Sequence, residues 1–286
     1  MPSLLDIRRR IRSVKNTQQL TKAMKTVSAA KLRRAQERVM SARPYADQLR
    51  NVLANLAGKV ENISHPLLEI RPEERALVVI VTADRGLCGA FNTNLIRATQ
   101  NFLRENAKKR DVTLFPVGRK GRDFFRRREA SITGDYVNFF NKLDYGHAKD
   151  IAKTITDLYT EAKIDAVYIV YNEFKSAIQQ RISMEKLLPL GRADLGNTQE
   201  TPAEYIFEQP PQQVFDRLLP RYVEIQVYRA LLESAASEHG ARMAAMDTAS
   251  RNAGEMIESL TLNMNRVRQA AITREIIEVV SGAGAL

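Results

Sequence analysis

Two glycine-containing segments are the places where residue types and spacing could support chemistry on a phosphate group. Gly86 and Gly89 follow an apolar run and precede a helical stretch, a position where α/β proteins often hold phosphates. Their spacing is not G-x-G-x-x-G, and the segment GRKG at 118–121 is not part of a G-x-x-x-x-G-K-[ST] motif, which the chain lacks. We therefore interpret these glycines as parts of tight turns between strands and helices.

Other reactive residue types are few. The chain has one cysteine, Cys88, with no histidine nearby in sequence, so we interpret it as a packing residue in a reducing compartment. The three histidines do not share metal-ligand spacing: His65, His147 and His239. Paired carboxylates stand in polar segments typical of solvated faces: Glu73/Glu74 and Glu275/Glu278. The sequence predicts no catalytic site, no metal site and no cofactor.

The net charge is concentrated at one end of the chain. The 286 residues carry a formal net charge of +11, and 44% of them are hydrophobic, which is typical of a soluble folded protein. Residues 1–57 contain 13 Lys and Arg against 3 Asp and Glu, whereas residues 58–211 contain 23 against 21 and residues 212–286 contain 8 against 9. This asymmetry indicates an acidic partner, which could be nucleic acid, an anionic membrane or a protein surface.

The basic segment has helical periodicity. Apolar residues recur every three or four positions: Ile7, Ile11, Val14, Leu20, Met24, Val27. Ser3 is the expected N-cap, with Asp6 three residues later, and Gly58 is the expected end of the helix. Pro44 lies inside this pattern and is expected to kink or interrupt the helix.

A second long helix is predicted over residues 212–280, with Gly282 as its end. Its seam follows steps of three and four residues through fourteen positions: Ile225, Tyr228, Leu232, Ala235, His239, Met243, Met246, Ser250, Ala253, Ile257, Leu260, Met264, Val267, Ala271. A seam this long needs an equally long partner, and the N-terminal helix is the only one available. We expect the two to form an antiparallel coiled coil in which the C-terminal helix projects beyond its partner.

The middle of the chain alternates strand and helix patterns. Strands are predicted at 76–82, 112–117, 165–171, 178–188 and 203–207, and helices at 92–108 and 147–162. This order favours a small Rossmann-like α/β domain with a mostly parallel sheet. The predicted organisation is therefore a helix over 1–58, an α/β domain over 59–210 and a helix over 211–286.

Five segments carry more specific patterns. Nearest the C-terminus is ITREIIEVVSGAG at 272–284, preceded by RQA at 268–270. The others are SVKNTQQLTKAMKTVSAAKLRRAQ at 13–36, ARPYA at 42–46, TADRGLCGAFN at 82–92 and RYVEIQVYRALLESAASEHGARMAAM at 221–246. Together, and in this order, they resemble the gamma subunit of F-type ATP synthases over the whole chain.

The resemblance implies a rotor without catalytic activity of its own. In this family one gamma subunit per complex places its coiled coil inside a ring of alpha and beta subunits. Its α/β foot sits on the c-subunit ring and binds epsilon. Proton flow turns the c ring with gamma, and the turning shaft drives the beta sites through their states for ATP synthesis or hydrolysis. The basic N-terminal helix then suits acidic loops of the beta subunits, and the apolar tip around Val279 and Val280 suits a bearing that must not grip.

The resemblance also implies contact residues. Contacts with the alpha and beta ring are expected at six positions: Lys22, Met24, Lys25, Arg268, Gln269 and Thr273. Contacts of the foot with the c ring and epsilon are expected at Tyr205 and Glu208. The sequence departs from the family pattern here, because Gln209 stands between Glu208 and Pro210.

The expected location is the cytoplasmic face of a bacterial inner membrane, as a peripheral subunit, since neither a secretory signal nor a transit peptide is predicted. Two other interpretations remain open on the residues alone. A nucleic-acid-binding coiled coil would use the basic helix, although Tyr45 is the only aromatic residue in 1–57. A Rossmann-like enzyme with helical arms would bind a nucleotide in its middle domain.

Overall fold

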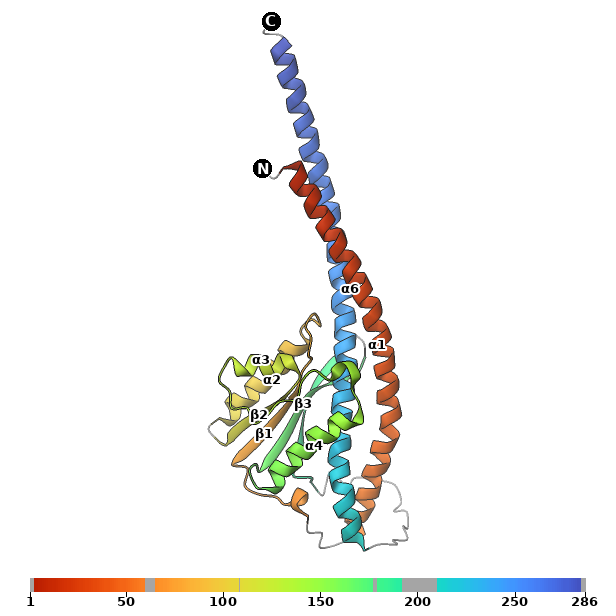
Figure 1. Cartoon of the computed structure of the whole chain (residues 1–286), viewed down its shortest axis with the longest axis vertical. Helices are drawn as coiled ribbons and strands as arrows, with labels where there is room; N and C mark the ends of the chain where they lie inside the picture. Colours follow the sequence, from red (N-terminus) through yellow and green to blue (C-terminus); the bar gives the residue numbers. More distant parts are fainter. Residues whose placement is uncertain (1–2, 60–64, 108, 177–178, 192–209, 284–286) are drawn as a thin grey trace. The chain divides into compact units, whose positions relative to one another are not determined.

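The computed structural model describes residues 3–59, 65–107, 109–176, 179–191 and 210–283 (Figure 1). The chain divides into two compact units. We call residues 1–28 and 242–286 the helical unit, and residues 29–241 the sheet unit. Both divisions fall inside long helices, so each terminal helix contributes to both units. The three-part division with boundaries after residues 58 and 210 stays a prediction.

The sheet unit contains a mixed four-stranded sheet. Its strands are β1 (Arg75–Val81), β2 (Asp111–Val117), β3 (Ala166–Phe174) and β4 (Gln180–Leu188), in the order β2-β1-β3-β4. β1 pairs in parallel with β2 and β3, and β4 pairs antiparallel to β3 at the edge. This confirms the mostly parallel sheet, and β4 falls within the strand predicted at 178–188. β1 is buried from Ala76 to Val81, as expected for a continuous apolar run.

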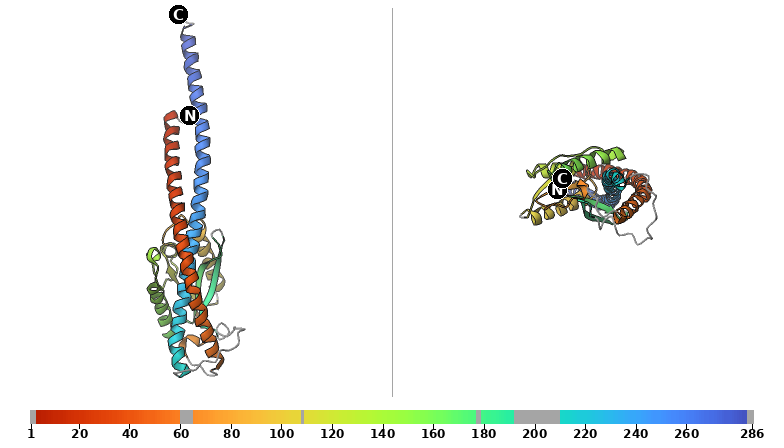
Figure 2. Two further views of the ribbon diagram at one scale, coloured as in Figure 1. Left: turned by 90° about the vertical axis from the view of Figure 1, so that its right-hand side faces the viewer. Right: turned by 90° about the horizontal axis from the view of Figure 1, so that it is seen from below.

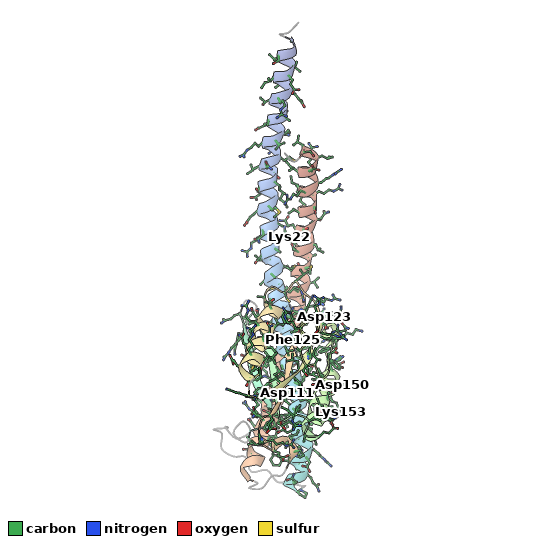
Figure 3. The ribbon with its side chains drawn as sticks, turned by 90° about the vertical axis from the view of Figure 1, so that its left-hand side faces the viewer. Lys22, Asp111, Asp123, Phe125, Asp150 and Lys153 are labelled. Atoms are coloured by element: carbon green, nitrogen blue, oxygen red, sulfur yellow. The ribbon has the colours of Figure 1, made fainter. Side chains whose placement is uncertain are left out.

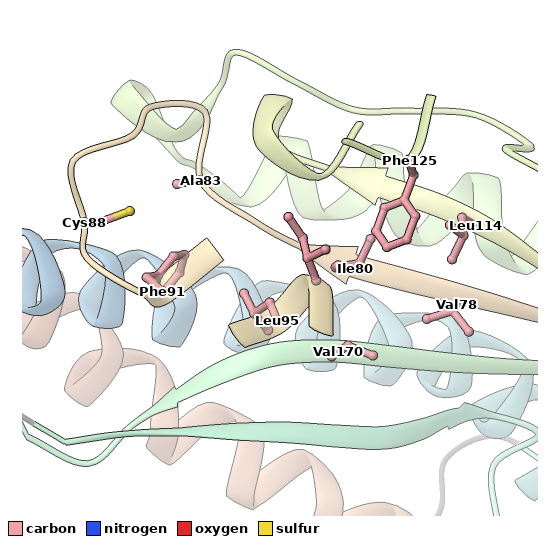
Figure 4. Packing of buried hydrophobic residues seen from close by; sticks show 10 residues of the cluster. Val78, Ile80, Ala83, Cys88, Phe91, Leu95, Leu114, Phe125 and Val170 are labelled. Carbon is pink, nitrogen blue, oxygen red and sulfur yellow. The ribbon is translucent and has the colours of Figure 1, made fainter. Parts of the chain in front are cut away.

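Three helices pack on this sheet. α2 (Phe91–Asn106) and α3 (Arg119–Arg126) contribute to a core cluster on one face of the sheet (Figure 4). That cluster joins side chains of both helices to strand residues: Phe91, Leu95, Phe125, Val78, Ile80, Leu114 and Val170. α4 (Tyr145–Thr160) buries its own apolar face, which includes Ile151 and Ile155. Asp144 begins α4 through a capping box with His147.

α3 is a helix that the sequence pattern did not predict, because residues 118–128 read as a basic, polar segment. The helix is only eight residues long, and its apolar contribution comes from Phe125 and the partly buried Phe124. Its start depends on two close approaches. A Cβ at Gly118, whose φ is 100°, would lie 2.0 Å from the carbonyl oxygen of Thr82. The Gly121 amide donates to Thr82 Oγ1 at 2.8 Å.

The terminal helices are longer than predicted. α1 spans Leu4–Lys59 and α6 spans Pro211–Ala283. Gly58 and Gly282 were expected to end these helices, but both lie one residue inside them. A glycine costs about 1 kcal/mol relative to alanine inside a helix, and the last turn tolerates this because few hydrogen bonds depend on it.

The sequence predicts an N-terminal cap for α1 at Ser3 and a kink or interruption of the helix at Pro44. Ser3 Oγ accepts from the Asp6 amide at 3.2 Å, while Asp6 Oδ2 accepts from the Ser3 amide at 3.3 Å. This reciprocal pair confirms the predicted N-terminal cap. Pro44 does not interrupt the helix, since α1 is continuous across it.

In the helical unit the two helices run antiparallel. Lys25 contacts Asp247, while Gln18, earlier on α1, donates to the carbonyl oxygen of Ser250, later on α6. Within this unit α6 continues past the beginning of α1 (Figure 2). Both observations confirm the predicted antiparallel pair and its longer C-terminal helix.

The predicted seam of α6 is confirmed along its length. None of its fourteen positions from Ile225 to Ala271 is exposed. Between residues 242 and 271 the burial is confined largely to this stripe, as a two-helix contact requires. Between residues 230 and 238 every residue is buried, so α6 is enclosed on all sides there. That enclosure includes polar side chains such as Glu233 and Ser237, which a single-stripe pattern does not predict.

Candidate functional site

The three predicted contact residues on α1 have different surroundings. Lys22 is exposed on the helical unit, where Figure 3 labels it on α1. Met24 is half-buried. Lys25 Nζ donates to Asp247 Oδ1 at 2.6 Å, so its charge already has a partner on α6. The hydrogen bond and charge of Lys25 lower the pKa of Asp247. Lys22 is therefore the more available of the two cations.

The three predicted contact residues on α6 lie close together. Arg268, Gln269 and Thr273 are all exposed. Gln269 and Thr273 are four residues apart and so lie one above the other, whereas Arg268 directly precedes Gln269 and points about 100° around the helix from it. The Thr273 hydroxyl donates to the carbonyl oxygen of Gln269 at 2.9 Å, which holds this side chain against the helix. All three therefore lie on a stretch of α6 that no other described segment of the unit covers.

The end of α6 exposes an apolar surface. Val279 is 70% exposed and Val280 65% exposed, and the isoleucines Ile272 and Ile276 are also exposed. These four line a shallow hollow of about 250 Å³ together with Glu275. Val279 and Val280 were predicted as part of this surface from the sequence, whereas the two isoleucines were not, although their spacing of four residues indicates a shared face. We call these four aliphatic residues the α6 tip.

The loop after β1 has the backbone of a tight turn, as predicted. Gly89 has φ of 57°, and Leu87 adopts a φ of 63°, an uncommon conformation for a residue with a side chain. Leu87 is exposed, whereas Cys88 is buried in the core cluster, which agrees with its interpretation as a packing residue.

Side-chain oxygens of the chain itself accept hydrogen bonds from backbone amides that follow β1 and β2. Asp84 Oδ1 accepts from the backbone amides of Arg119 and Asn138, both at 3.0 Å. Asn92 Oδ1 accepts from the amide of Ala83 at 2.9 Å. At the start of α3 the amide of Arg119 therefore binds an internal carboxylate, and the next two amides bind the carbonyl oxygen of Ala83 and Oγ1 of Thr82.

The predicted foot contacts cannot be placed. Tyr205, Glu208 and the strand expected at 203–207 lie outside the described residues. Among the residues that the structure describes, no group of three or more His, Cys, Asp and Glu side chains is arranged to hold a metal ion. No described helix combines the length and apolar character that crossing a membrane requires.

Comparison with known protein families gives a match over almost the whole chain. The family described as ATP synthase matches residues 3–286. The ATP synthase gamma chain of Solibacter usitatus (strain Ellin6076) is 56% identical over 289 residues, which span 100% of this chain and 99% of the relative. The ATP synthase gamma chain of Desulfitobacterium hafniense (strain DSM 10664 / DCB-2) is 53% identical over 287 residues, spanning all of both chains.

Solved structures are also similar. A chain from the central stalk and c-ring of Tetrahymena thermophila mitochondrial ATP synthase is 29% identical, with a TM-score of 0.61, over 81% of this chain and 99% of that chain. A chain from the rotor of Euglena gracilis mitochondrial ATP synthase is similar in fold, with 19% identity and a TM-score of 0.71, over 94% of this chain and 98% of that one. With two bacterial relatives matched at more than half of all positions, the chain belongs to the ATP synthase gamma chain family.

Proposed function

We propose that this chain is the central-stalk rotor of a bacterial F-type ATP synthase. The observation that carries the proposal is the 56% identity to a bacterial gamma chain over the whole length, joined to a C-terminal helix whose end contacts no other described segment of its unit. The rotor contributes no catalytic site. Proton flow turns the c ring together with this chain, and the rotation drives the beta subunits in turn through their catalytic states.

The partners follow from this role. One copy of the chain binds the alpha and beta ring, epsilon and the c ring, and reaches the cytoplasmic face of the inner membrane only through the c ring. Lys22, Met24 and Lys25 meet beta on one helix, and Arg268, Gln269 and Thr273 meet it on the other. Tyr205 and Glu208 form the foot contact. The exposure of Lys22, Arg268 and Gln269 supports this assignment.

Co-purification tests the function directly. A tagged full chain should recover alpha, beta and epsilon, and should restore ATPase activity when mixed with alpha and beta. A chain that folds, by circular dichroism, yet assembles with neither alpha nor beta would refute the proposal.

The contact at Arg268 can be tested against a neighbouring arginine. Arg268→Ala should lower the ATPase rate of the reconstituted complex several-fold, because Arg268 is an exposed cation that directly precedes Gln269 in the motif shared with the family. Arg274→Ala, also an exposed arginine at this end of α6, is the matched control, because it points about 100° or more around the helix from Arg268, Gln269 and Thr273. Equal rates for the two variants would remove Arg268 from the contact.

The α6 tip is proposed to turn inside an apolar sleeve. Strong charge pairing at this point would create energy wells that oppose rotation. Val279→Lys with Val280→Lys should therefore slow rotation of single complexes, measured with a bead attached to the rotor. Val279→Ile with Val280→Ile keeps the surface apolar and should leave the rate unchanged. Lysine variants that rotate at the original rate would contradict the sleeve.

A further inference from the structure

A cavity of about 640 Å³ lies between α1 and α6 within the sheet unit. Its volume lies within the range of sites that bind drug-sized molecules. The floor consists of buried aliphatic residues from both helices: Val39, Ala46, Ile225 and Leu232. One wall is aromatic, because the rings of Tyr145 and Tyr228 meet edge to face with their centroids 5.5 Å apart. The cavity thus offers an apolar body a place to bind.

The charges around this cavity leave a positive rim. Arg43 and Arg50 line the cavity from α1, and among the described residues neither has an ion-pair partner. They are seven residues apart, two helical turns, so both face the cavity from the same side of α1. The other lining arginines are already paired, Arg221 with Glu224 and Arg229 with Glu233, each at 3.3 Å. The two free guanidinium groups can therefore receive an anion.

The acidic residues of the lining reduce this surplus only in part. Glu173 is paired with Lys175 at 2.6 Å, and Glu233 is paired with Arg229. Asp47 is the one lining carboxylate without an ion-pair partner among the described residues, and it stands between two free arginines.

At the opposite end of the cavity, one carboxylate oxygen lacks a hydrogen-bond donor among the described residues. The side chain of Glu233 is only 2% exposed, and its Oε2 has no hydrogen-bond partner within the described structure. A buried acceptor without a donor costs free energy, so this position favours a ligand that supplies an O–H or N–H group. Because α1 and α6 run antiparallel, Glu233 lies at the Val39 end of the lining, and Arg50 lies at the other end with Arg221.

We propose that this cavity binds a small aromatic acid that carries a hydrogen-bond donor at its far end. The anionic group pairs with Arg43 and Arg50. The ring lies on the aliphatic floor beside Tyr145 and Tyr228, and the donor forms a hydrogen bond with Oε2 of Glu233. This site is separate from the rotor contacts proposed above and does not require assembly of the complex.

The test uses the full chain and a defined probe, 6-hydroxynaphthalene-2-sulfonate, in isothermal titration calorimetry. We expect saturable binding to one site. Arg43→Gln with Arg50→Gln should weaken it about tenfold or more, since the loss of a charged hydrogen bond is worth at least about 1.4 kcal/mol. Lys31→Gln with Arg34→Gln removes two exposed cations of α1 that do not line the cavity, and should leave affinity unchanged.

Two further comparisons locate the probe. Ala42→Phe fills the cavity without changing its charge and should abolish binding, while Val279→Ser with Val280→Ser should not affect it, which separates the cavity from the α6 tip. Naphthalene-2-sulfonate lacks the hydroxyl and should bind more weakly than the probe. The proposal is overturned if the wild-type chain does not bind the probe, if the arginine and control variants bind alike, or if the hydroxyl makes no difference.

Discussion

The same two helices are packed in different ways in the two units. In the sheet unit they bury large apolar side chains completely, among them Leu53, Phe215, Leu219, Val223 and Leu231, all at 0% exposure. In the helical unit six described positions are buried and none of them is at 0% exposure. Two are large and apolar, Ile7 and Met246, and four are small or polar: Thr21, Ser28, Ser250 and Ala253. Continuous helix therefore does not imply uniform stability along its length.

The difference follows from the number of neighbours. In the sheet unit α6 is enclosed on all sides between residues 230 and 238, so burial of apolar surface supplies stability from within the chain. In the helical unit two helices share one narrow seam, and the α6 tip has no described neighbour. Apolar surface left open in this way is typical of a site for other proteins.

The largest expected effect is a cavity in the sheet unit. Leu53→Ala should lower the free energy of unfolding by about 2–5 kcal/mol, because Leu53 is fully buried on α1. Leu20→Ala removes the same atoms from a 61% exposed position of the same helix in the helical unit, and should change it by less than about 0.5 kcal/mol. Urea unfolding followed by circular dichroism measures both. Similar decreases in the free energy of unfolding at the two positions would contradict the difference in packing between the units.

An intermediate effect is expected from carboxylates in the two units. Asp165 in the sheet unit accepts three hydrogen bonds from Arg75, from the amide, Nε and Nη2 at 2.9, 3.2 and 2.8 Å. These bonds lower the pKa of Asp165. Asp165→Asn should cost about 1–3 kcal/mol at pH 7. Asp247→Asn in the helical unit should cost less, because the Lys25 pair is exposed to solvent.

The pH dependence sharpens this second comparison. A carboxyl group whose pKa is lowered by folding stabilises the protein above its unfolded pKa of about 3.9, and that contribution is lost as the pH falls through the lower folded pKa. The cost of Asp165→Asn should therefore shrink as the pH falls below about 4. A cost that stays constant over this range, measured by urea unfolding at each pH, would show that the charge of Asp165 is not what stabilises the sheet unit.

The smallest effects are expected at two helical glycines, with opposite signs. Gly254→Ala in the helical unit should raise stability by about 0.5–1 kcal/mol, because a Cβ there meets only the movable end of Gln18, at 3.1 Å. Gly121→Ala in the sheet unit should lower it by about 1 kcal/mol or more, because the Cβ would lie 2.9 Å from Oγ1 of the buried Thr82. Thermal unfolding of both variants gives the signs, and a gain at Gly121 would contradict the tight packing of α3.

Periodicity predicted what depends on local sequence. The seam of α6, the cap at Ser3 and the strands of the sheet follow from residue spacing, and the structure confirms them. α3 was missed because its stability comes from tertiary packing of Phe125 on the sheet rather than from its own composition. The enclosure of α6 near Glu233 was missed for the same reason.

The contact residues were predicted less completely than the helices and strands. The exposed positions of Lys22 and Arg268 agree with a role in binding, but the pairing of Lys25 with Asp247 joins residues 222 positions apart, which spacing within one helix cannot reveal. The isoleucines of the α6 tip were available from the sequence and were overlooked beside the two valines.

The uncovered end of α6 affects the rate at which the helix opens as well as the surface available for binding. From residue 272 to residue 281 every described side chain is exposed, so only local hydrogen bonds hold these last turns. Helix ends without tertiary packing open readily, and their amide protons exchange with solvent quickly. When another surface covers this end, opening becomes rare and exchange slows. The exchange rate of the amide protons in the last turns of α6 therefore distinguishes an unassembled chain from one held by its partners.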